Sequence, residues 1–298
     1  MDIIVTIPAY NEEKTIGEVL QSIKKSLDGS HYKGKYRTLV VDDGSRDKTA
    51  DIAKKSGSIV YSHPKNYGLA ECFRTEIQKC IELNADVIVH IDADLQYMPK
   101  EIPKLIKEIE NGYDLVLGSR FKGEIEEMPL IKRFGNIAFS KVVSKITGLQ
   151  VSDAQTGFRA FTRKVAESIP IKSSHTYTQE QIIRAVKQKF RIKEVPIYFA
   201  KRDGKSRLIS NPFGYAARAG INILRIYRDY EPLKFFGVIG SSIFAAGILL
   251  GMYLVYFQFF GNGAFRHLGL MMLDVLILSI GLQIILFGFI ADMNNGRL

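Results

Sequence analysis

The sequence predicts an α/β fold: a mostly parallel sheet covered by helices on both faces, followed by membrane-spanning helices. Two observations support this prediction. Strand-like and helix-like segments alternate through the first two-thirds of the 298 residues, as is typical of parallel strands joined by helical crossovers. The stretch from Phe235 to Phe260 then has 26 residues and no charge, and a helix needs about 20 apolar residues to cross a bilayer.

The elements of the first domain follow from apolar periodicity. Apolar and β-branched runs predict strands at residues 2–8, 36–45 (ending in a turn), 58–62, 86–91 and 113–119. Apolar residues at helical spacing, such as Ile16, Val19 and Ile23, predict the connecting helices. These helices cover residues 12–27, 47–55, 69–83 and 100–111.

Polar residues follow the apolar run of three of these strands. They are PAYNE at 8–12, DDGS at 42–45 and DADLQ at 92–96. Right-handed crossovers bring the carboxyl ends of parallel strands to one edge of the sheet, where ligands of open α/β folds bind. A turn or helix cap would explain DDGS alone. Three acidic strand ends at one edge would repel each other without a cation or a donor-rich ligand, so we predict a site there.

Asp92, Asp94 and Gln96 offer hard oxygen ligands after one strand. This set suits Mg²⁺ or Mn²⁺ rather than zinc, and such ions usually bind nucleotide phosphates. Glycoside hydrolysis by two carboxyl groups is the alternative, but it needs a wider spacing. No Gly-x-Gly-x-x-Gly motif follows a predicted strand, so a dinucleotide-binding fold of the usual type is not expected. The GKS at 204–206 resembles the end of a phosphate-binding loop, but that loop needs a glycine where this chain has Phe199.

The last 90 residues predict a membrane anchor. In residues 209–231, Arg218, Asn222, Arg225 and Asp229 form a polar stripe opposite apolar residues, which predicts helices in the membrane interface or, alternatively, a helix packed on the soluble domain. A second span at 268–291 is interrupted only by Asp274. The expected domains are thus 1–208 (cytosolic), 209–231 (interface) and 232–298 (a two-span hairpin, with the first span at 235–260).

Charge predicts the orientation of the anchor. One cation, Arg266, lies between the spans, whereas eight lie just before the first span, at positions 201, 202, 205, 207, 218, 225, 228 and 234. The positive-inside rule places the large domain and both chain ends in the cytosol, and the start of the chain shows no signal peptide. The net charge of +10, concentrated here, favours lipid head groups and phosphates over nucleic acid. Cys72 and Cys80 suggest neither a disulfide framework nor a zinc site.

Seven motifs occur in an order that resembles family 2 glycosyltransferases of the GT-A fold. They are TIPAYNEE (6–13), VVDDGSRDKT (40–49), NYGLAE (66–71), DADLQ (92–96), GSR (118–120), DAQTGFRAF (153–161) and EVPIYFAKRDGKSRL (194–208). The sequence is most similar to the branch of dolichyl- and polyprenyl-phosphate mannose or glucose synthases that carry a two-helix membrane anchor. The resemblance covers residues 2–208, and the amphipathic segment and hairpin extend it to the end of the chain.

This resemblance implies roles for individual residues. Donor binding falls to Pro8, Tyr10, Glu12, Asp42, Asp92, Arg202 and Ser206. The metal on the donor diphosphate would be held by Asp92, Asp94 and Gln96. The lipid phosphate would be held by Arg120, Arg133 and Asn136, and arginine suits phosphate because its planar fork binds two oxygens. Asp94 and Arg120 are the expected catalytic residues.

The resemblance also implies a reaction, in which a hexose passes from a GDP-mannose or UDP-glucose type of donor to dolichyl or polyprenyl phosphate with inversion. The acceptor phosphate is already anionic, so no basic histidine is needed. A UDP-N-acetylhexosamine donor stays open. A processive polysaccharide synthase would be expected to carry a Gln-x-x-Arg-Trp motif, and the chain has no tryptophan. A non-catalytic relative would be expected to have lost its metal ligands, which are present.

Three details are specific to this sequence. Gly135 and Asn136 replace other residues of some mannosyl relatives, and Arg207 stands where lysine is common, so the sequence departs from the family pattern at the expected phosphate contacts. Gly247 and Gly251 form a small-xxx-small pair, which predicts close packing either within the hairpin or between hairpins of an oligomer.

Overall fold

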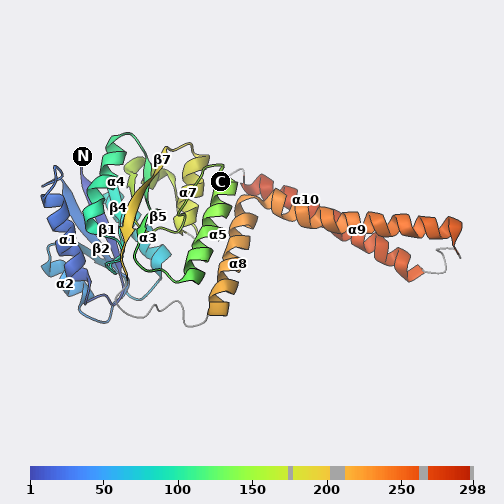
Figure 1. The fold of residues 1–298 in the computed structure, drawn as a ribbon, viewed down its shortest axis with the longest axis horizontal. Helices are drawn as coiled ribbons and strands as arrows, with labels where there is room; N and C mark the ends of the chain where they lie inside the picture. The colour runs from blue at the N-terminus through green and yellow to red at the C-terminus, as the bar shows by residue number, and fades with distance from the viewer. Residues whose placement is uncertain (174–176, 202–211, 262–267, 296–298) are drawn as a thin grey trace. The chain divides into compact units, whose positions relative to one another are not determined.

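The computed structural model describes residues 1–173, 177–201, 212–261 and 268–295. The chain divides into two compact units, Met1–Ala219 and Gly220–Leu298 (Figure 1). The first unit is an α/β domain and the second consists largely of two long helices. The predicted fold class is confirmed.

The sheet of the first unit has seven strands in the order β3-β2-β1-β4-β6-β5-β7. All adjacent pairs are parallel except the two that involve β6, which runs against β4 and β5. The strands are β1 (Ile3–Ala9), β2 (Tyr36–Asp42), β3 (Ile59–Ser62), β4 (Val87–His90), β5 (Leu115–Ile125), β6 (Arg159–Thr162) and β7 (Ile192–Phe199). The sequence pattern predicted the first five strands, and β6 and β7 complete the sheet.

Helices cover both faces of the sheet. Every residue of β1 is buried, because Ile3, Val5 and Ile7 belong to the core beneath α1 and α4, whereas Thr6 points to α3 and donates a hydrogen bond to Glu76. The helices of this unit are α1 (Ile16–Asp28), α2 (Thr49–Lys55), α3 (Leu69–Glu82), η1 (Pro99–Glu101), α4 (Ile102–Glu110), α5 (Leu130–Thr147), α6 (Arg163–Ser168) and α7 (Tyr177–Lys187).

Two boundaries differ from the sequence prediction for local reasons. The first helix begins at Ile16 rather than Glu12, because residues 12–15 form a turn in which Thr15 and Ile16 both donate to the Glu12 carbonyl. Strand β5 extends to Ile125 rather than stopping at 119, because it pairs with β7 again after a register shift. Gly123 allows this second pairing, since a Cβ there would clash with the backbone of Ile197.

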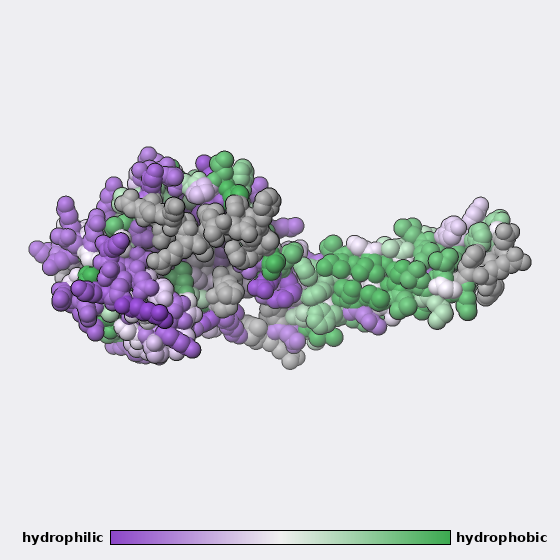
Figure 2. Space-filling view, turned by 90° about the horizontal axis from the view of Figure 1, so that it is seen from below, coloured by the Kyte–Doolittle hydropathy of each residue, from purple (hydrophilic) through white to green (hydrophobic). Residues whose placement is uncertain are grey.

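Helix α8 (Pro212–Tyr230) lies in the segment predicted to be amphipathic. It is followed by α9 (Pro232–Phe260) and α10 (Leu268–Asn295), which are long and apolar enough to cross a membrane by length and composition. Figure 2 shows hydrophobic surface along these two helices.

Helices α9 and α10 pack closely through glycine. A Cβ at Gly240 would meet the backbone of Gly281, one at Gly247 would meet Leu278, and one at Gly251 would lie 3.1 Å from Asp274. The small-residue pair at 247 and 251 therefore packs within the hairpin, and an oligomer of hairpins stays a prediction.

Candidate active site

A cavity of about 290 Å³ opens at the carboxyl ends of β1, β2 and β4. Its lining comes from the three polar strand ends, from the loop that precedes α3 and from the first turn of α3. The lining residues are Pro8, Ala9, Tyr10, Glu12, Asp43, Asn66, Gly68, Leu69, Cys72, Asp92, Ala93 and Asp94. The predicted gathering of strand ends at one edge is thus what the fold produces, and five of the predicted site residues share this cavity.

The loops that carry these residues have unusual backbone conformations. Asn11 and Leu95 have φ angles of 54° and 61°, in the left-handed region that residues other than glycine rarely adopt. Each lies within a predicted site motif, beside Glu12 or Asp94. Such strain persists where the surrounding structure enforces it, and it clusters at functional sites.

Asp42 and Asp43 face different surroundings, although they are adjacent. Asp42 is buried at the end of β2 and accepts a hydrogen bond from the Ser45 amide, so it supports the turn and does not line the cavity. Asp43 lines the cavity, yet the sequence assigned it no role. The donor-binding role predicted for Asp42 stays a prediction.

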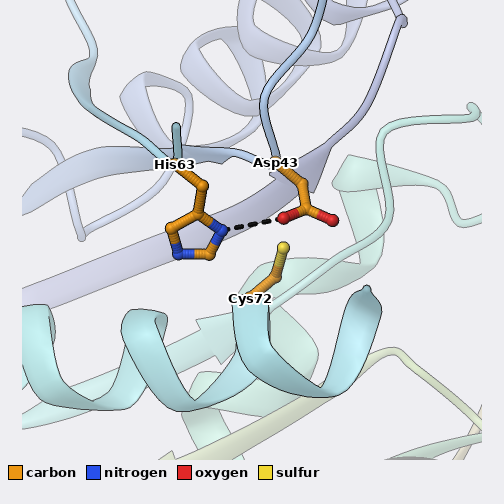
Figure 3. Close-up of side chains that lie close together, drawn as sticks. All are labelled: Asp43, His63 and Cys72. Atoms are coloured by element: carbon orange, nitrogen blue, oxygen red, sulfur yellow. Dashed lines mark hydrogen bonds and ion pairs between the residues drawn. The ribbon is translucent and has the colours of Figure 1, made fainter. Parts of the chain in front are cut away.

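Asp43 holds the loop before α3 (Figure 3). Its Oδ1 accepts from the Tyr67 amide at 2.9 Å and lies 2.8 Å from Nδ1 of His63, and its Oδ2 accepts from the Gly68 amide at 2.8 Å. The other ring nitrogen of His63 is 2.9 Å from the hydroxyl of Thr75. The carboxylate therefore fixes one wall of the cavity through backbone amides.

Asp43, His63 and Cys72 also form a group that could hold a metal ion, the one such group of three found among the described residues. Its chemistry favours the hydrogen-bonded role. Both carboxylate oxygens of Asp43 already accept from backbone amides, and burial together with Asp43 raises the pKa of the Cys72 thiol, which opposes the thiolate form that binds metals.

Asp92 and Asp94 are the carboxylates best placed to take a cation in the cavity. Burial, followed by the charge of Asp94, raises the pKa of Asp92 to about 6. Crowded carboxylates of this kind are stabilised by a divalent ion. Gln96 is buried, and its amide nitrogen lies 3.4 Å from the Ala200 carbonyl. Its remaining amide oxygen is the group that would serve as a ligand.

A buried polar chain lies behind Asp92. His90 is fully buried at the end of β4, with Nδ1 2.6 Å from Oε2 of Glu76 and Nε2 3.8 Å from Oδ1 of Asp92. The Thr6 hydroxyl donates to the same Glu76 oxygen at 2.9 Å. His90 thus connects a buried glutamate to the cavity aspartate. The sequence pattern predicted no role for His90 or Glu76, and it placed Glu76 in an amphipathic helix as an ordinary acidic residue.

Arg120 lies on β5 and is buried against Asp153. Its Nε is 2.6 Å from Oδ2 of Asp153 and its Nη2 is 2.7 Å from Oδ1. This two-point pair fixes the plane of the guanidinium. Asp153 lies in the DAQTG motif, which had no assigned role, so the structure adds a partner that the sequence did not reveal.

The other expected phosphate ligands lie on α5. Arg133 is exposed and Asn136 is buried, with the Asn136 Oδ1 atom lacking a hydrogen-bond partner among the described residues. Helix α5 is joined to the Asp153 segment, because the Ala154 amide donates to Ser140 at 2.9 Å. Arg202 and Ser206 fall outside the described residues, so their predicted roles rest on sequence.

Comparison with known proteins identifies the family. Residues 4–169 match the model of glycosyl transferase family 2. The chain belongs to this family. A dolichyl-phosphate hexose transferase of Haloferax volcanii is 34% identical over 227 residues, which cover 76% of this chain and 93% of that protein. A UDP-N-acetylglucosamine–dolichyl-phosphate N-acetylglucosaminyltransferase of Methanococcus voltae is 35% identical over 219 residues, covering 65% and 84%.

Solved structures support the fold of this glycosyltransferase. Glucosyl-3-phosphoglycerate synthase from Mycobacterium tuberculosis, in complex with Mn²⁺, UDP and phosphoglyceric acid, aligns with a TM-score of 0.59 and 23% identity, covering 75% of this chain and 77% of that one. The GT-A type of α/β fold expected from the sequence motifs is therefore confirmed.

Proposed function

We propose that this family 2 glycosyltransferase transfers a hexose from a nucleotide sugar of the GDP-mannose or UDP-glucose type to dolichyl or polyprenyl phosphate, with inversion. The observation that carries the proposal is the shared cavity of Tyr10, Glu12, Asp92 and Asp94 at the sheet edge. Two of the relatives described above are named as dolichyl-phosphate transferases, which supports this class of acceptor.

In this proposal, different residues of the cavity bind different parts of the nucleotide sugar. Pro8, Tyr10 and Glu12, at the end of β1, hold the base and ribose, next to the wall that Asp43 fixes. Asp92, Asp94 and the Gln96 oxygen would hold Mg²⁺ or Mn²⁺ on the diphosphate. These three side chains fit such an ion, because they offer hard oxygen ligands and include a crowded carboxyl group. When bound, the ion would neutralise charge on the leaving diphosphate.

The acceptor side uses cations of the chain. Arg120, oriented by Asp153, together with Arg133 and Asn136, would hold the lipid phosphate so that one oxygen faces the anomeric carbon. That oxygen attacks the carbon from the side opposite the diphosphate, the bond to the diphosphate breaks, and the anomeric configuration inverts. Because the attacking oxygen is anionic at neutral pH, positioning supplies most of the catalysis.

The two apolar helices would hold the enzyme where its lipid acceptor resides. We propose that α9 and α10 cross the cell membrane, with the catalytic unit and both chain ends in the cytosol, as the cations before α9 indicate. The domain boundaries predicted above belong to the same proposal.

A second donor class is favoured by one observation. The M. voltae relative, named for N-acetylglucosamine transfer from UDP-N-acetylglucosamine, is 35% identical, similar to the 34% of the hexose transferase. An N-acetylhexosamine donor is therefore the alternative to be tested alongside the hexose donors.

The test uses the full-length protein in detergent with polyprenyl phosphate, Mn²⁺ or Mg²⁺, and each radiolabelled sugar nucleotide in turn. We expect label from one donor to enter the lipid phase, and EDTA to abolish this transfer. Asp94→Asn should remove the activity, whereas Asp51→Asn, a matched change at an exposed site on α2, should leave it intact. Transfer that is insensitive to EDTA, or an active Asp94→Asn variant, would contradict the proposal.

A further inference from the structure

Glu194 on β7 carries a carboxylate that does not line the donor cavity and yet is almost fully buried. Its side chain keeps only 5% of its surface exposed. Its Oε1 atom accepts three hydrogen bonds, from the Ser152 amide at 2.9 Å, the Ser152 hydroxyl at 2.9 Å and the Asp153 amide at 3.0 Å. Hydrogen bonds to an ionised acceptor are among the strong ones. One oxygen of Glu194 therefore fixes the backbone of residues 152–153 against β7.

The other oxygen of Glu194 receives its counter-charge from Lys122. The Lys122 ammonium nitrogen lies 2.8 Å from Oε2, and the lysine side chain is half exposed. Oε2 has no aligned hydrogen bond within the part of the chain that the structure describes, so this contact is an ion pair. Exposed ion pairs contribute little to stability. The hydrogen bonds of Oε1 are consequently the main way in which Glu194 orders its surroundings.

The backbone that Glu194 fixes is the one that holds Arg120. The Asp153 carboxylate accepts from the Arg120 amide and forms the two-point pair with its guanidinium. The Ser152 hydroxyl lies 2.6 Å from the hydroxyl of Ser119, the residue before Arg120. Glu194 thus connects to the guanidinium through Asp153, by hydrogen bonds of 3.0 Å or less.

Strand pairing alone does not orient Arg120. The register between β5 and β7 shifts between Ser119 and Glu124, so residues 120–123 form a bulge. A bulge interrupts the alternation of a strand and redirects its side chains. The direction of the Arg120 side chain is therefore set by the contacts that it makes, above all by the Asp153 carboxylate.

We propose that Glu194 is a positioning residue for the acceptor phosphate, which fixes the backbone of Asp153 and through it the plane of the Arg120 guanidinium. The inference rests on the proposed function in one respect, because it takes Arg120 as a ligand of the lipid phosphate. Glu194 itself contacts no substrate in this arrangement. Lys122 balances its charge as Arg120 balances that of Asp153, so the support adds no net negative charge beside an anionic acceptor.

The first test follows Arg120 without using transferase activity. Phenylglyoxal modifies arginine side chains, and peptide mass spectrometry of the full-length protein in detergent gives the rate of modification at Arg120. In Glu194→Val the buried amides of residues 152–153 lose their acceptor, so we expect Arg120 to react about tenfold faster than in wild type. Glu167→Val is the matched control, because it makes the same change at an exposed ion pair with Arg163. Its rate at Arg120 should equal that of wild type.

An unchanged rate at Arg120 in Glu194→Val would overturn the proposal. Glu194→Gln keeps an oxygen for the same amides but makes it a neutral acceptor, which binds about half as strongly. We expect an intermediate rate in this variant, about threefold above wild type. If Glu194→Val does not fold, a wild-type rate in Glu194→Gln would overturn the proposal in its place.

The second test separates positioning from general stabilisation. In transfer assays with the full-length protein, Glu194→Val should raise the KM for polyprenyl phosphate about tenfold, since a misplaced ligand binds the phosphate poorly. The affinity for Mn²⁺ with UDP, measured by calorimetry, should stay within about twofold of wild type, because Glu194, Asp153 and Arg120 do not line the donor cavity.

Equal losses on the donor and acceptor sides would show that Glu194 only stabilises the fold, and would overturn the proposal. Faster modification of Arg120 with an unchanged KM for polyprenyl phosphate has a different meaning. It would support the orienting role of Glu194 and contradict the acceptor role of Arg120 in the proposed function. The two failures are therefore distinguishable.

Discussion

Arg120 and Asp153 form a buried two-point ion pair, with Nε–Oδ2 and Nη2–Oδ1 distances of 2.6 and 2.7 Å. The Arg120 amide also donates to Oδ2, at 3.1 Å. A guanidinium held in this way has a fixed plane, and its third nitrogen, Nη1, takes no part in the pair. We therefore regard Asp153 as a positioning residue for the proposed acceptor site.

Replacing Asp153 should harm both stability and activity. Asp153→Asn leaves a buried cation without its counter-charge, and breaking a buried pair costs about 3–5 kcal/mol. Thermal unfolding in detergent measures this loss. The double variant Asp153→Asn with Arg120→Met removes the unpaired charge, so it should recover much of the stability while transfer stays abolished. A double variant that is active would refute the role given to Arg120.

The chain from Glu76 through His90 should support donor binding at Asp92. Glu76→Gln combined with His90→Phe avoids a buried unpaired charge and keeps the aromatic ring that packs against Phe73 at 5.1 Å. Loss of a residue that supports a metal ligand costs about 10–100-fold in metal affinity. Calorimetric titration with Mn²⁺ and UDP should show a loss of this order, and the KM for lipid phosphate should not change. A lower melting temperature with unchanged Mn²⁺ affinity would mean that the chain only stabilises the core.

Gly157 leaves room for the Asp92 carboxylate. A Cβ at this position would lie 3.0 Å from Oδ2 of Asp92, so Gly157→Ala should displace the carboxylate by a few tenths of an ångström. We expect donor affinity to fall about 3- to 10-fold, since small misplacements at a site are costly. Gly220→Ala on α8 meets no atom within 4 Å and is the control for adding a methyl group. Equal donor affinity in the two variants would argue against a tight fit at Asp92.

The raised pKa of Asp92 predicts a pH dependence. With a pKa of about 6, the carboxyl group is protonated below that pH and competes with a cation, so Mn²⁺ affinity in the presence of UDP should fall about tenfold per pH unit below about 6. Asp92→Asn should bind more weakly and lose this dependence. A wild-type affinity that is constant from about pH 5 to 7 would contradict the assignment.

The raised pKa of Asp92 has the opposite effect on the metal-free protein, because it makes the folded state more stable at low pH than at high pH. The folded state keeps its Asp92 proton up to about pH 6, whereas the unfolded chain loses it near the ordinary value of 3.8. The folded state therefore binds more protons in this window, and the free energy of unfolding should decrease as pH rises through it. Melting temperatures of wild type and Asp92→Asn in EDTA measure the difference.

Sequence reasoning reached the cavity because parallel topology determines where strand ends meet. Once β1, β2 and β4 were recognised by their apolar runs, Tyr10, Glu12, Asp92 and Asp94 had to share an edge. Strand β6 was missed because it has four residues and no alternation. It runs antiparallel, which a pattern of alternating strands and helices does not suggest.

The residues that sequence could not supply act across long separations. Asp153 pairs with Arg120 from 33 positions away, and Asp43 holds Tyr67 and Gly68 from 24 and 25 positions away. The sequence around these two adjacent residues does not show that Asp43, rather than Asp42, holds the loop. In the sequence, Glu76 is an ordinary acidic residue of a predicted helix, and only its contact with His90 in the structure shows that it is buried.

The hydrogen bonds of Asp43 have a thermodynamic consequence for substrate choice. Because the amides of this wall already donate to a carboxylate, the wall should lose little conformational entropy when a nucleotide binds. Nucleotide binding should therefore show a heat-capacity change no larger than the buried apolar surface requires. In the proposed donor site, such a rigid wall would discriminate by exclusion. A nucleobase of the wrong shape would be rejected rather than accommodated, and altering base preference would require rebuilding the segment that Asp43 secures.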